Sequence, residues 1–252
     1  MTENSAYVGA IHDFEGVWNL HLDGEADSIS RHRERFLSTL ERVFVCLESI
    51  YTPTSIRARV IVYADGVEIG DIDKGNPEKT HRTKKIESDE GFDAHEIKSF
   101  LESVLSEDLS SVVYSVETDG RTEFILPDDV VTIGQDKTDQ YKLLKAGDVV
   151  GTPQYSPFRV EMFYRRPDAR NDPDSIAVKI HTETDLWFQV TELGEKNRER
   201  VRNAFSCIDG ECEIQDYEFG SSLFGTWSII NRHFDLVEVM PDQISDRFDW
   251  EG

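Results

Sequence analysis

The sequence predicts an α+β protein with a mostly antiparallel sheet built from hairpins and about three helices, near residues 28–51, 93–108 and 192–207. Apolar residues recur at helical spacing in those three segments, and short alternating segments follow one another along the chain. Asp-Gly dipeptides separate the members of two such pairs, which is typical of hairpins rather than of parallel strands joined by helices.

The first expected elements are a strand over 16–22 and the helix over 28–51. Alternation in the strand places its tryptophan toward a core. Asp27 or Ser28 can cap the helix, and Pro53 prevents its continuation. Three arginines and a histidine crowd the first turns, where basic groups oppose the helix dipole, so we expect acidic groups to pair with them. The favoured local partners are Glu25, Asp27 and Glu34.

A hairpin is expected next, in which 56–63 pairs with 67–72 across an Asp-Gly turn. The polar stretch 73–92 contains glycine, asparagine and proline and is expected to be a long loop or a linker. Asp93 followed by Glu96 resembles a capping box and marks the start of the second helix.

A second hairpin is expected between 112–116 and 122–126, across a Thr-Asp-Gly turn, with a third strand at 130–133. The third helix is expected to end at Asp209-Gly210. The other expected strands are 158–164, 176–181, 211–217, 226–230 and 234–240.

The preferred organisation is one compact unit over residues 1–252, with long loops at 73–92 and 134–157. The alternative is a pair of subdomains, 1–72 and 93–252, joined by the first of these loops. A chain of 252 residues can bury a large core without stabilising disulfides or metals.

The composition is strongly acidic: 50 Asp and Glu stand against 27 Lys and Arg, and the formal net charge is −23. The acids are dispersed, and arginine outnumbers lysine, 17 to 10. About 1 M salt shortens the Debye length to about 3 Å and screens such self-repulsion. We therefore expect a halophilic protein, from an archaeon or one of its viruses, with an ordinary acidic mesophilic protein as the alternative. The charge argues against non-specific binding to nucleic acid or to anionic membranes.

The sequence also bears on where the protein acts. No stretch of 18 apolar residues predicts a membrane span, and the N-terminus lacks the basic and apolar regions of a secretory signal. We therefore expect a soluble protein of the cytoplasm, or a virion component of a halophilic host.

Motifs that carry chemistry are weak or missing. The chain has no phosphate-binding glycine loop and no nucleophile elbow. Cys207 and Cys212 flank a helix end without a second pair of zinc ligands, and Cys46 is expected to pack as a small apolar side chain. Three cysteines cannot all pair, so no disulfide scaffold is expected. No catalytic residue, cofactor or metal site is assigned.

Basic side chains gather in the acid-free stretch 79–85. In a chain with few lysines, this cluster predicts contact with an acidic partner or with nucleic acid, although a solvated flexible loop is the simpler interpretation. The candidate contact residues are Lys79, Arg82, Lys84 and Lys85.

Aromatic residues near the C-terminus form a second candidate set. A place in the core is their default interpretation, and an interface is the alternative, because aromatic side chains are favoured anchors. The candidate interface residues are Phe219, Phe224, Trp227 and Phe234.

Together these observations predict a non-enzymatic protein of interaction, structure or assembly that acts on a protein partner or on itself and is adapted to high salt. Nucleic-acid contact through the lysine-rich loop is the first alternative, helped by Arg57, Arg59 and the basic face of the third helix. An enzyme with a dispersed site is the second alternative, for example where His181, Asp185 and a cysteine converge. That basic face consists of Lys196, Arg198, Arg200 and Arg202.

Overall fold

The computed structural model describes residues 16–24, 26, 28–63, 79–107, 110–125, 130–133, 158–165, 175–182, 192–221 and 225–229. Within these ranges three helices accompany a nine-stranded sheet, which confirms the predicted α+β class. The helices are α1 (Ile29–Leu47), α3 (Ala94–Ser106) and α5 (Glu192–Cys212). The strands are β1 (Gly16–Asp23), β2 (Tyr51–Tyr63), β3 (Lys79–Glu87), β4 (Ser111–Ile125), β5 (Val130–Ile133), β6 (Phe158–Arg165), β7 (Ser175–Thr182), β8 (Ile214–Ser221) and β9 (Gly225–Ile229).

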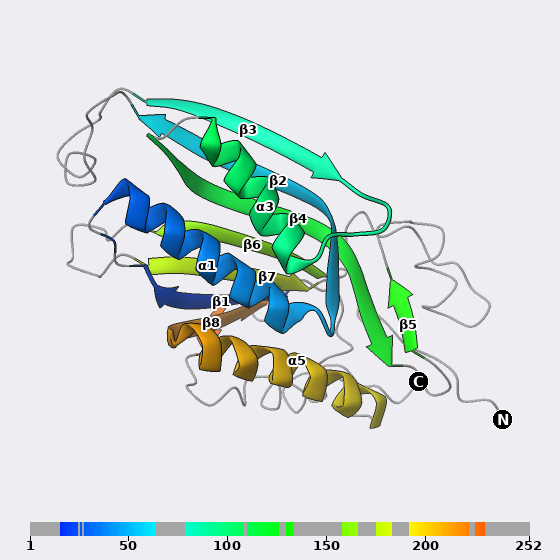
Figure 1. Cartoon of the computed structure of the whole chain (residues 1–252). Coiled ribbons are helices and arrows are strands. Elements are labelled where there is room, and N and C mark those ends of the chain that lie inside the picture. The colour runs from blue at the N-terminus through cyan, green and yellow to red at the C-terminus, as the bar shows by residue number, and fades with distance from the viewer. Residues whose placement is uncertain are drawn as a thin grey trace.

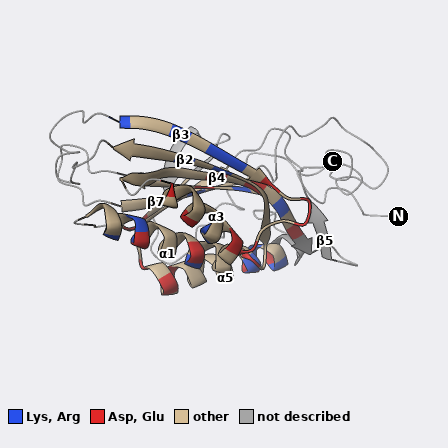
Figure 2. Cartoon of the chain, turned by 45° about the horizontal axis from the view of Figure 1, so that its top comes forward, with Lys and Arg blue, Asp and Glu red and all other residues tan. Residues whose placement is uncertain are grey.

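The sheet has the strand order β3-β2-β4-β6-β7-β1-β8-β9, and β5 pairs with one end of β4. Every pairing between described strands is antiparallel. The three helices lie on one face of this sheet, with α1 between α3 and α5 and in contact with both (Figures 1 and 2). Strands from both sides of the expected linker therefore belong to one continuous sheet.

The core lies between the helices and the sheet. The burial of β1 alternates strictly, and the Trp18 side chain is 1% exposed, as its strand pattern predicts. Its ring centroid lies 5.4 Å from that of Phe205 on α5 and 5.1 Å from that of Phe219 on β8. Aromatic pairs at such distances contribute about 0.5–1.5 kcal/mol beyond their buried area, so Trp18 stabilises the docking of α5 on the sheet.

The helix caps follow the sequence prediction. The Ser28 hydroxyl accepts a hydrogen bond from the Arg31 amide at 3.3 Å, and Asp93 and Glu96 form both bonds of a capping box, at 2.7 and 2.9 Å. However, α1 ends four residues before the expected position, and β2 begins at Tyr51. The apolar pattern continues past the helix because the first residues of β2 are buried in the same core.

Two of the basic residues at the start of α1 reach groups outside their own helix, and the expected partners Glu25 and Asp27 lie outside the described residues. Arg35 pairs with the carboxylate of Asp23 on β1, and Arg33 donates from Nη2 to the carbonyl oxygen of Leu105 at 2.7 Å. Leu105 lies in the last turn of α3, where a cation is favourable to the helix dipole. Arg33 is thus placed to stabilise the C-terminus of a neighbouring helix.

The first strand of the first expected hairpin belongs to β2, and its described neighbours are β3 and β4. Across Ser55–Tyr63, β2 pairs on one side with β3, and from Ser55 to Val62 it pairs on the other with β4. The expected return strand at 67–72 lies outside the described residues. The prediction of a loop is wrong for residues 79–87, which form β3. The loop expected at 134–157 lies outside the described residues.

The second expected hairpin is wrong. β4 runs without a turn from Ser111 to Ile125, straight through Asp119-Gly120. A Cβ atom on Gly120 would lie 2.2 Å from the Thr52 carbonyl oxygen and 2.7 Å from the Pro53 Cα atom. This glycine therefore allows the backbones of β4 and β2 to approach closely beside a bulge of β2, and it does not form a turn.

The third helix also extends past its expected end. α5 continues through Asp209 and Gly210 to Cys212, and Glu213 then adopts a left-handed conformation with φ 54°. Asp209 stabilises this end of the helix by accepting two hydrogen bonds from backbone amides. Its carbonyl oxygen accepts from the Glu213 amide and its carboxylate accepts from the Ile214 amide, both at 3.0 Å. The backbone therefore turns one residue after the helix, at Glu213.

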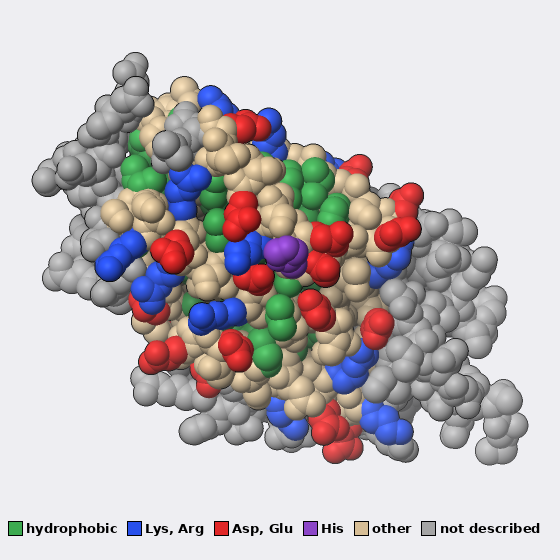
Figure 3. Space-filling model, in the orientation of Figure 1, with side chains coloured by type: hydrophobic (Ala, Val, Ile, Leu, Met, Phe, Trp, Pro, Cys, Tyr) green, Lys and Arg blue, Asp and Glu red, His purple; other side chains and the backbone are tan. Residues whose placement is uncertain are grey.

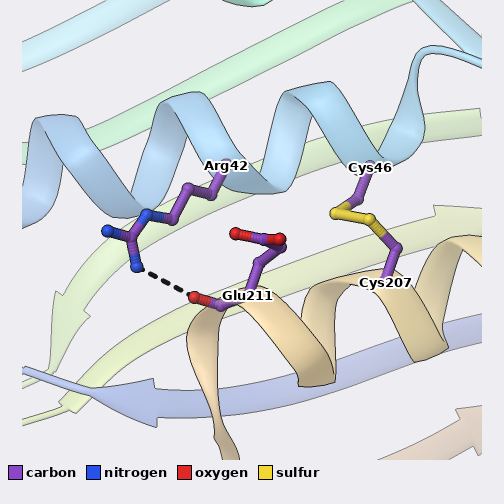
Figure 4. Close-up of a disulfide and its surroundings, with 4 residues drawn as sticks. All are labelled: Arg42, Cys46, Cys207 and Glu211. Carbon is purple, nitrogen blue, oxygen red and sulfur yellow. Dashed lines mark hydrogen bonds between the residues drawn. A yellow bond between two sulfur atoms is a disulfide. The ribbon is translucent and has the colours of Figure 1, made fainter.

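A disulfide joins Cys46 on α1 to Cys207 on α5, across 161 residues of sequence (Figure 4). Cys46 is buried in the core as the sequence predicts, but its sulfur is bonded to Cys207, which was not expected because a count of three cysteines does not show which two meet in space. Nearby, Arg42 donates from Nη1 to the Glu211 carbonyl oxygen at 2.9 Å, which adds a second link between the same helices.

Arg200 on α5 is a structural residue. Its guanidinium donates to the Glu123 carbonyl oxygen at 2.9 Å, pairs with the Glu123 carboxylate at 3.1 Å and also donates to the Ser49 carbonyl oxygen. Its side chain is 18% exposed, and its contacts connect α5 to the end of β4 and to the turn before β2. Arg200 thus belongs to the interior contacts of the fold more than to a basic surface.

We expect Arg200→Ala to lower the free energy of unfolding by about 2 kcal/mol, because two carbonyl oxygens and one carboxylate lose a charged donor. Urea unfolding followed by circular dichroism measures this change. Lys196→Ala, at an exposed position of the same helix, is the control and should change the value by less than about 0.5 kcal/mol. Equal effects of the two substitutions would show that the Arg200 contacts contribute little.

Candidate functional site

The lysine-rich segment forms the edge strand β3. Among the strands that the structure describes, its one neighbour is β2, and none of the others lies along its second edge. All residues of β3 are exposed except Ile86, which is partly buried against the core. Figure 2 shows basic residues along this strand at the border of the sheet. An edge strand presents backbone N–H and C=O groups that another strand can pair with.

The structure brings the four candidate residues together on this one strand: Lys79, Arg82, Lys84 and Lys85. Side chains alternate along a strand, so Arg82 and Lys84 share the helix side of the sheet with Ile86, and Lys79 and Lys85 share the opposite side. Four basic residues thus stand on β3 against one carboxylate, Glu87. The edge is locally positive in a protein whose net charge is −23.

Carboxylates of the same chain pair with part of this cluster. On the helix side, Glu107 lies 3.1 Å from Lys84 Nζ and 3.9 Å from Arg82 Nη1. On the other side, Glu87 pairs with Lys85. The side chains of Lys84 and Glu107 are 44% and 45% exposed, and such exposed pairs contribute only about 0–1 kcal/mol. These contacts can therefore be exchanged for a partner's carboxylates at low cost.

Two arginines of β2 extend the basic surface on the face away from the helices. Arg57 lies opposite Lys85, and Arg59 lies opposite Thr83. Both pair with Glu117 of β4, at 3.3 and 2.7 Å. The sequence predicts that these arginines help the lysine-rich segment as part of an expected loop, and the pairing of β2 with β3 is what places them beside it.

The aromatic candidates are not assembled into a described interface. Phe219 is 1% exposed and packs against Trp18, so it belongs to the core and is not available as a surface anchor. Trp227 falls within β9, whose pairing with β8 is described. Phe224 and Phe234 lie outside the described residues.

Among the residues named for a dispersed catalytic site, His181 and Cys212 do not converge. His181 of β7 alternates with the core residue Ile180, so it faces away from the helices, whereas Cys212 ends α5 on the helix side. Burial raises the pKa of the Cys212 thiol to about 11, so it is a protonated thiol at neutral pH and a poor nucleophile. Asp185 lies outside the described residues. Among those described, no group of three or more His, Cys, Asp or Glu side chains could bind a metal ion.

A groove of about 600 Å³ runs between α1 and the end of α5. Its charged lining mixes arginines with acids, and the helix side of the molecule shows the same interleaving of both signs (Figure 3). Two of the lining arginines already have partners within the chain: Arg35 pairs with the Asp23 carboxylate, and Arg42 donates to the Glu211 carbonyl oxygen. The groove therefore offers no concentrated charge of one sign to a ligand.

His181 is held in its neutral form. Burial, with additional contributions from Arg159 and Lys179, lowers its pKa to about 4. Arg159 Nη2 lies 3.4 Å from His181 Nδ1, and an unprotonated ring nitrogen can accept a hydrogen bond from it. Protonation of His181 would place a third positive charge beside Arg159 and Lys179.

We expect NMR titration of the imidazole to give a pKa near 4 for His181. Because the folded pKa lies below the unfolded value of about 6.5, the unfolded state binds the proton more tightly, and stability falls as pH decreases from about 6.5 toward 4. His181→Gln should flatten the stability profile in that window. A measured pKa above 6 would contradict this prediction, and Arg159→Gln, which removes one of the two positive neighbours, should raise the pKa.

No protein family matches the chain, and no curated protein resembles it significantly in sequence. None of the described helices is both long and apolar enough to cross a membrane. The geometry of the described residues therefore carries the functional argument, and β3 is the feature that stands apart from the rest of the molecule in charge and exposure.

Proposed function

We propose that the protein acts without catalysis, as an interaction or assembly protein that docks a partner strand along β3. The observation that carries this proposal is a strand edge with no neighbour among the described strands, combined with a concentration of basic side chains in a strongly acidic chain. Strand addition of this kind obtains affinity from backbone hydrogen bonds and specificity from alternating side chains. Lysine also protects free edges from aggregation, and this role is compatible with selective docking.

Adaptation to high salt forms part of the same proposal. The supporting observations are the net charge of −23 and the low number of lysines, of which three lie on β3. In about 1 M salt, charges act over only about 3 Å, so recognition depends on side chains in direct contact. An exposed strand edge provides such contact along nine residues.

The disulfide supports a location in an oxidising environment. Disulfides persist outside the reducing cytoplasm of most organisms and are common in extracellular particles and secreted proteins. Of the two locations expected from sequence, a virion component is therefore the one that we propose, in preference to the cytoplasm.

Site-specific photocrosslinking tests the proposal. A photoreactive benzoylphenylalanine is placed at Thr83 on β3 or, as the matched control, at exposed Asn203 on α5. Both proteins are irradiated in extract of the native source in 1 M KCl, with and without nuclease. We expect a stoichiometric protein adduct from position 83 alone, unaffected by nuclease. No adduct, or equal adducts from both positions, would contradict docking at β3, and adducts to nucleic acid would favour the alternative function.

A further inference from the structure

The chemistry of β3 also indicates what kind of strand it accepts. We infer that the partner is an extended segment with adjacent acidic residues from a different protein, and that it adds to β3 as the next strand of the sheet. This inference rests on the proposed function and specifies its partner. Three features support it: the alternation of basic side chains, the exchangeable internal carboxylates and the poor fit of β3 to a second copy of itself.

The alternation determines where the partner's acids must lie. Arg82 and Lys84 project on the helix side of β3, and Lys79 and Lys85 project on the other side. Directly opposed side chains on neighbouring strands have Cβ atoms about 4.5–5.5 Å apart, which is within reach of a salt bridge. Two consecutive acids in a partner strand also point to opposite sides. An acidic pair at its centre would therefore meet Lys84 on one side and Lys85 on the other.

The internal carboxylates occupy places that a partner's acids would take. Glu107, at the C-cap of α3, contacts both Arg82 and Lys84. The Glu107 side chain is 45% exposed, so water can solvate its carboxylate when the contact with Lys84 breaks. Glu87, which lies two residues after Lys85 on β3, pairs with Lys85 in the same way. Both pairs show that the basic side chains are positioned to bind carboxylates on each side of the strand.

A second copy of β3 does not have this complementarity. If two copies pair antiparallel about a two-fold axis at Thr83, Lys84 of one strand lies opposite Arg82 of the other. If the axis passes through Arg82 or Lys84, that residue lies opposite itself. Like charges directly opposed across strands are destabilising, so each of these central registers is disfavoured. The edge therefore selects against self-association and in favour of an acidic strand.

A labelled peptide tests the inference. The probe is a nine-residue fluorescein-labelled peptide of valine and threonine with a central Asp-Glu pair, and its control carries Asn-Gln instead. Fluorescence anisotropy is measured with the full chain in 1 M KCl. We expect the acidic peptide to bind about tenfold more tightly than the amide peptide. Equal binding of the two peptides, or binding of neither, would overturn the inference.

Charge reversal locates the binding. The double variant Lys84→Glu with Lys85→Glu should lose at least tenfold in affinity for the acidic peptide, and Lys84→Gln with Lys85→Gln should show a smaller loss. Lys196→Glu on α5 is the control and should bind as the unchanged protein does. Urea unfolding verifies that each variant is folded. An unchanged affinity in the folded double-Glu variant would overturn the assignment to β3.

Backbone pairing has its own test. Two further acidic peptides carry N-methyl groups on alternate residues, one peptide for each of the two alternating sets. Strand addition requires the N–H groups of one set only, so one peptide should lose binding and the other should retain it. Equal binding of the two would overturn strand addition. Light scattering that shows a dimer abolished by the double-Glu variant would instead identify a second copy as the occupant and overturn the inference.

The inference can fail while the proposed function stands. If photocrosslinking at Thr83 captures a protein whose crosslinked segment is helical or lacks acidic residues, docking at β3 is supported and the acidic-strand inference is overturned. If the acidic peptide binds at β3 but no native protein crosslinks there, the chemistry of the edge is supported and the proposed function is contradicted.

Discussion

Removing the disulfide between Cys46 and Cys207 is expected to lower the free energy of unfolding by about 5 kcal/mol. The two cysteines are 161 residues apart, and in the chain-entropy account a cross-link closing so long a loop restricts the unfolded state by about this amount. The disulfide also connects α1 to α5, whose Phe205 packs against Trp18. Loss of the disulfide therefore weakens the packing of α5 against α1 and against β1.

Cys46→Ala with Cys207→Ala measures this effect in urea, and unfolding of the unchanged protein with and without a thiol reductant gives an independent value. Cys212→Ala is the control, because this half-buried thiol is not bonded, and it should change the free energy of unfolding by less than about 1 kcal/mol. Reduction that leaves the unfolding midpoint unchanged would contradict the prediction. It would also remove the support that the disulfide gives to an oxidising location.

The elements with strong local signals could be predicted from the sequence. The Asp93–Glu96 capping box and the alternation around Trp18 depend on neighbours within a few residues, and the structure confirms both. Helix ends were less predictable. The apolar pattern of α1 continues into Tyr51 because a helix and a strand that bury residues in one core look alike where they join.

The candidate site was predicted in composition but not in shape. The acid-free run of Lys79, Arg82, Lys84 and Lys85 was identifiable by its charge, and its polarity suggested a loop. Its place at the sheet edge depends on strand order, which pairs β3 with β2 and leaves the other side of β3 without a described strand. Such long-range pairing has no local signal, and the same is true of the Cys46–Cys207 disulfide.

Gly120→Ala is expected to lower the free energy of unfolding by about 3 kcal/mol. A Cβ atom at this position would lie 2.2 Å from the Thr52 carbonyl oxygen and 2.7 Å from the Pro53 Cα atom, and both belong to the backbone of β2. Backbone atoms cannot rotate away as the end of a side chain can, so the β2–β4 pairing itself must move, and overpacking of this kind typically costs about 1–3 kcal/mol or more. Alanine's smaller loss of backbone entropy returns only about 0.5–1 kcal/mol.

Gly210→Ala is the matched control for this substitution. Gly210 lies inside α5, and no atom lies within 4 Å of where its Cβ would be, so alanine should raise the free energy of unfolding by about 0.5–1 kcal/mol. The two glycines each follow an aspartate, and both Asp-Gly pairs were expected to interrupt or end an element. Opposite effects of the two substitutions, measured by urea unfolding, would show that one glycine is required by a close strand approach and that the other is a replaceable helical residue. A neutral Gly120→Ala would mean that β2 and β4 can separate at this point without loss of the sheet, which would contradict the close approach of their backbones.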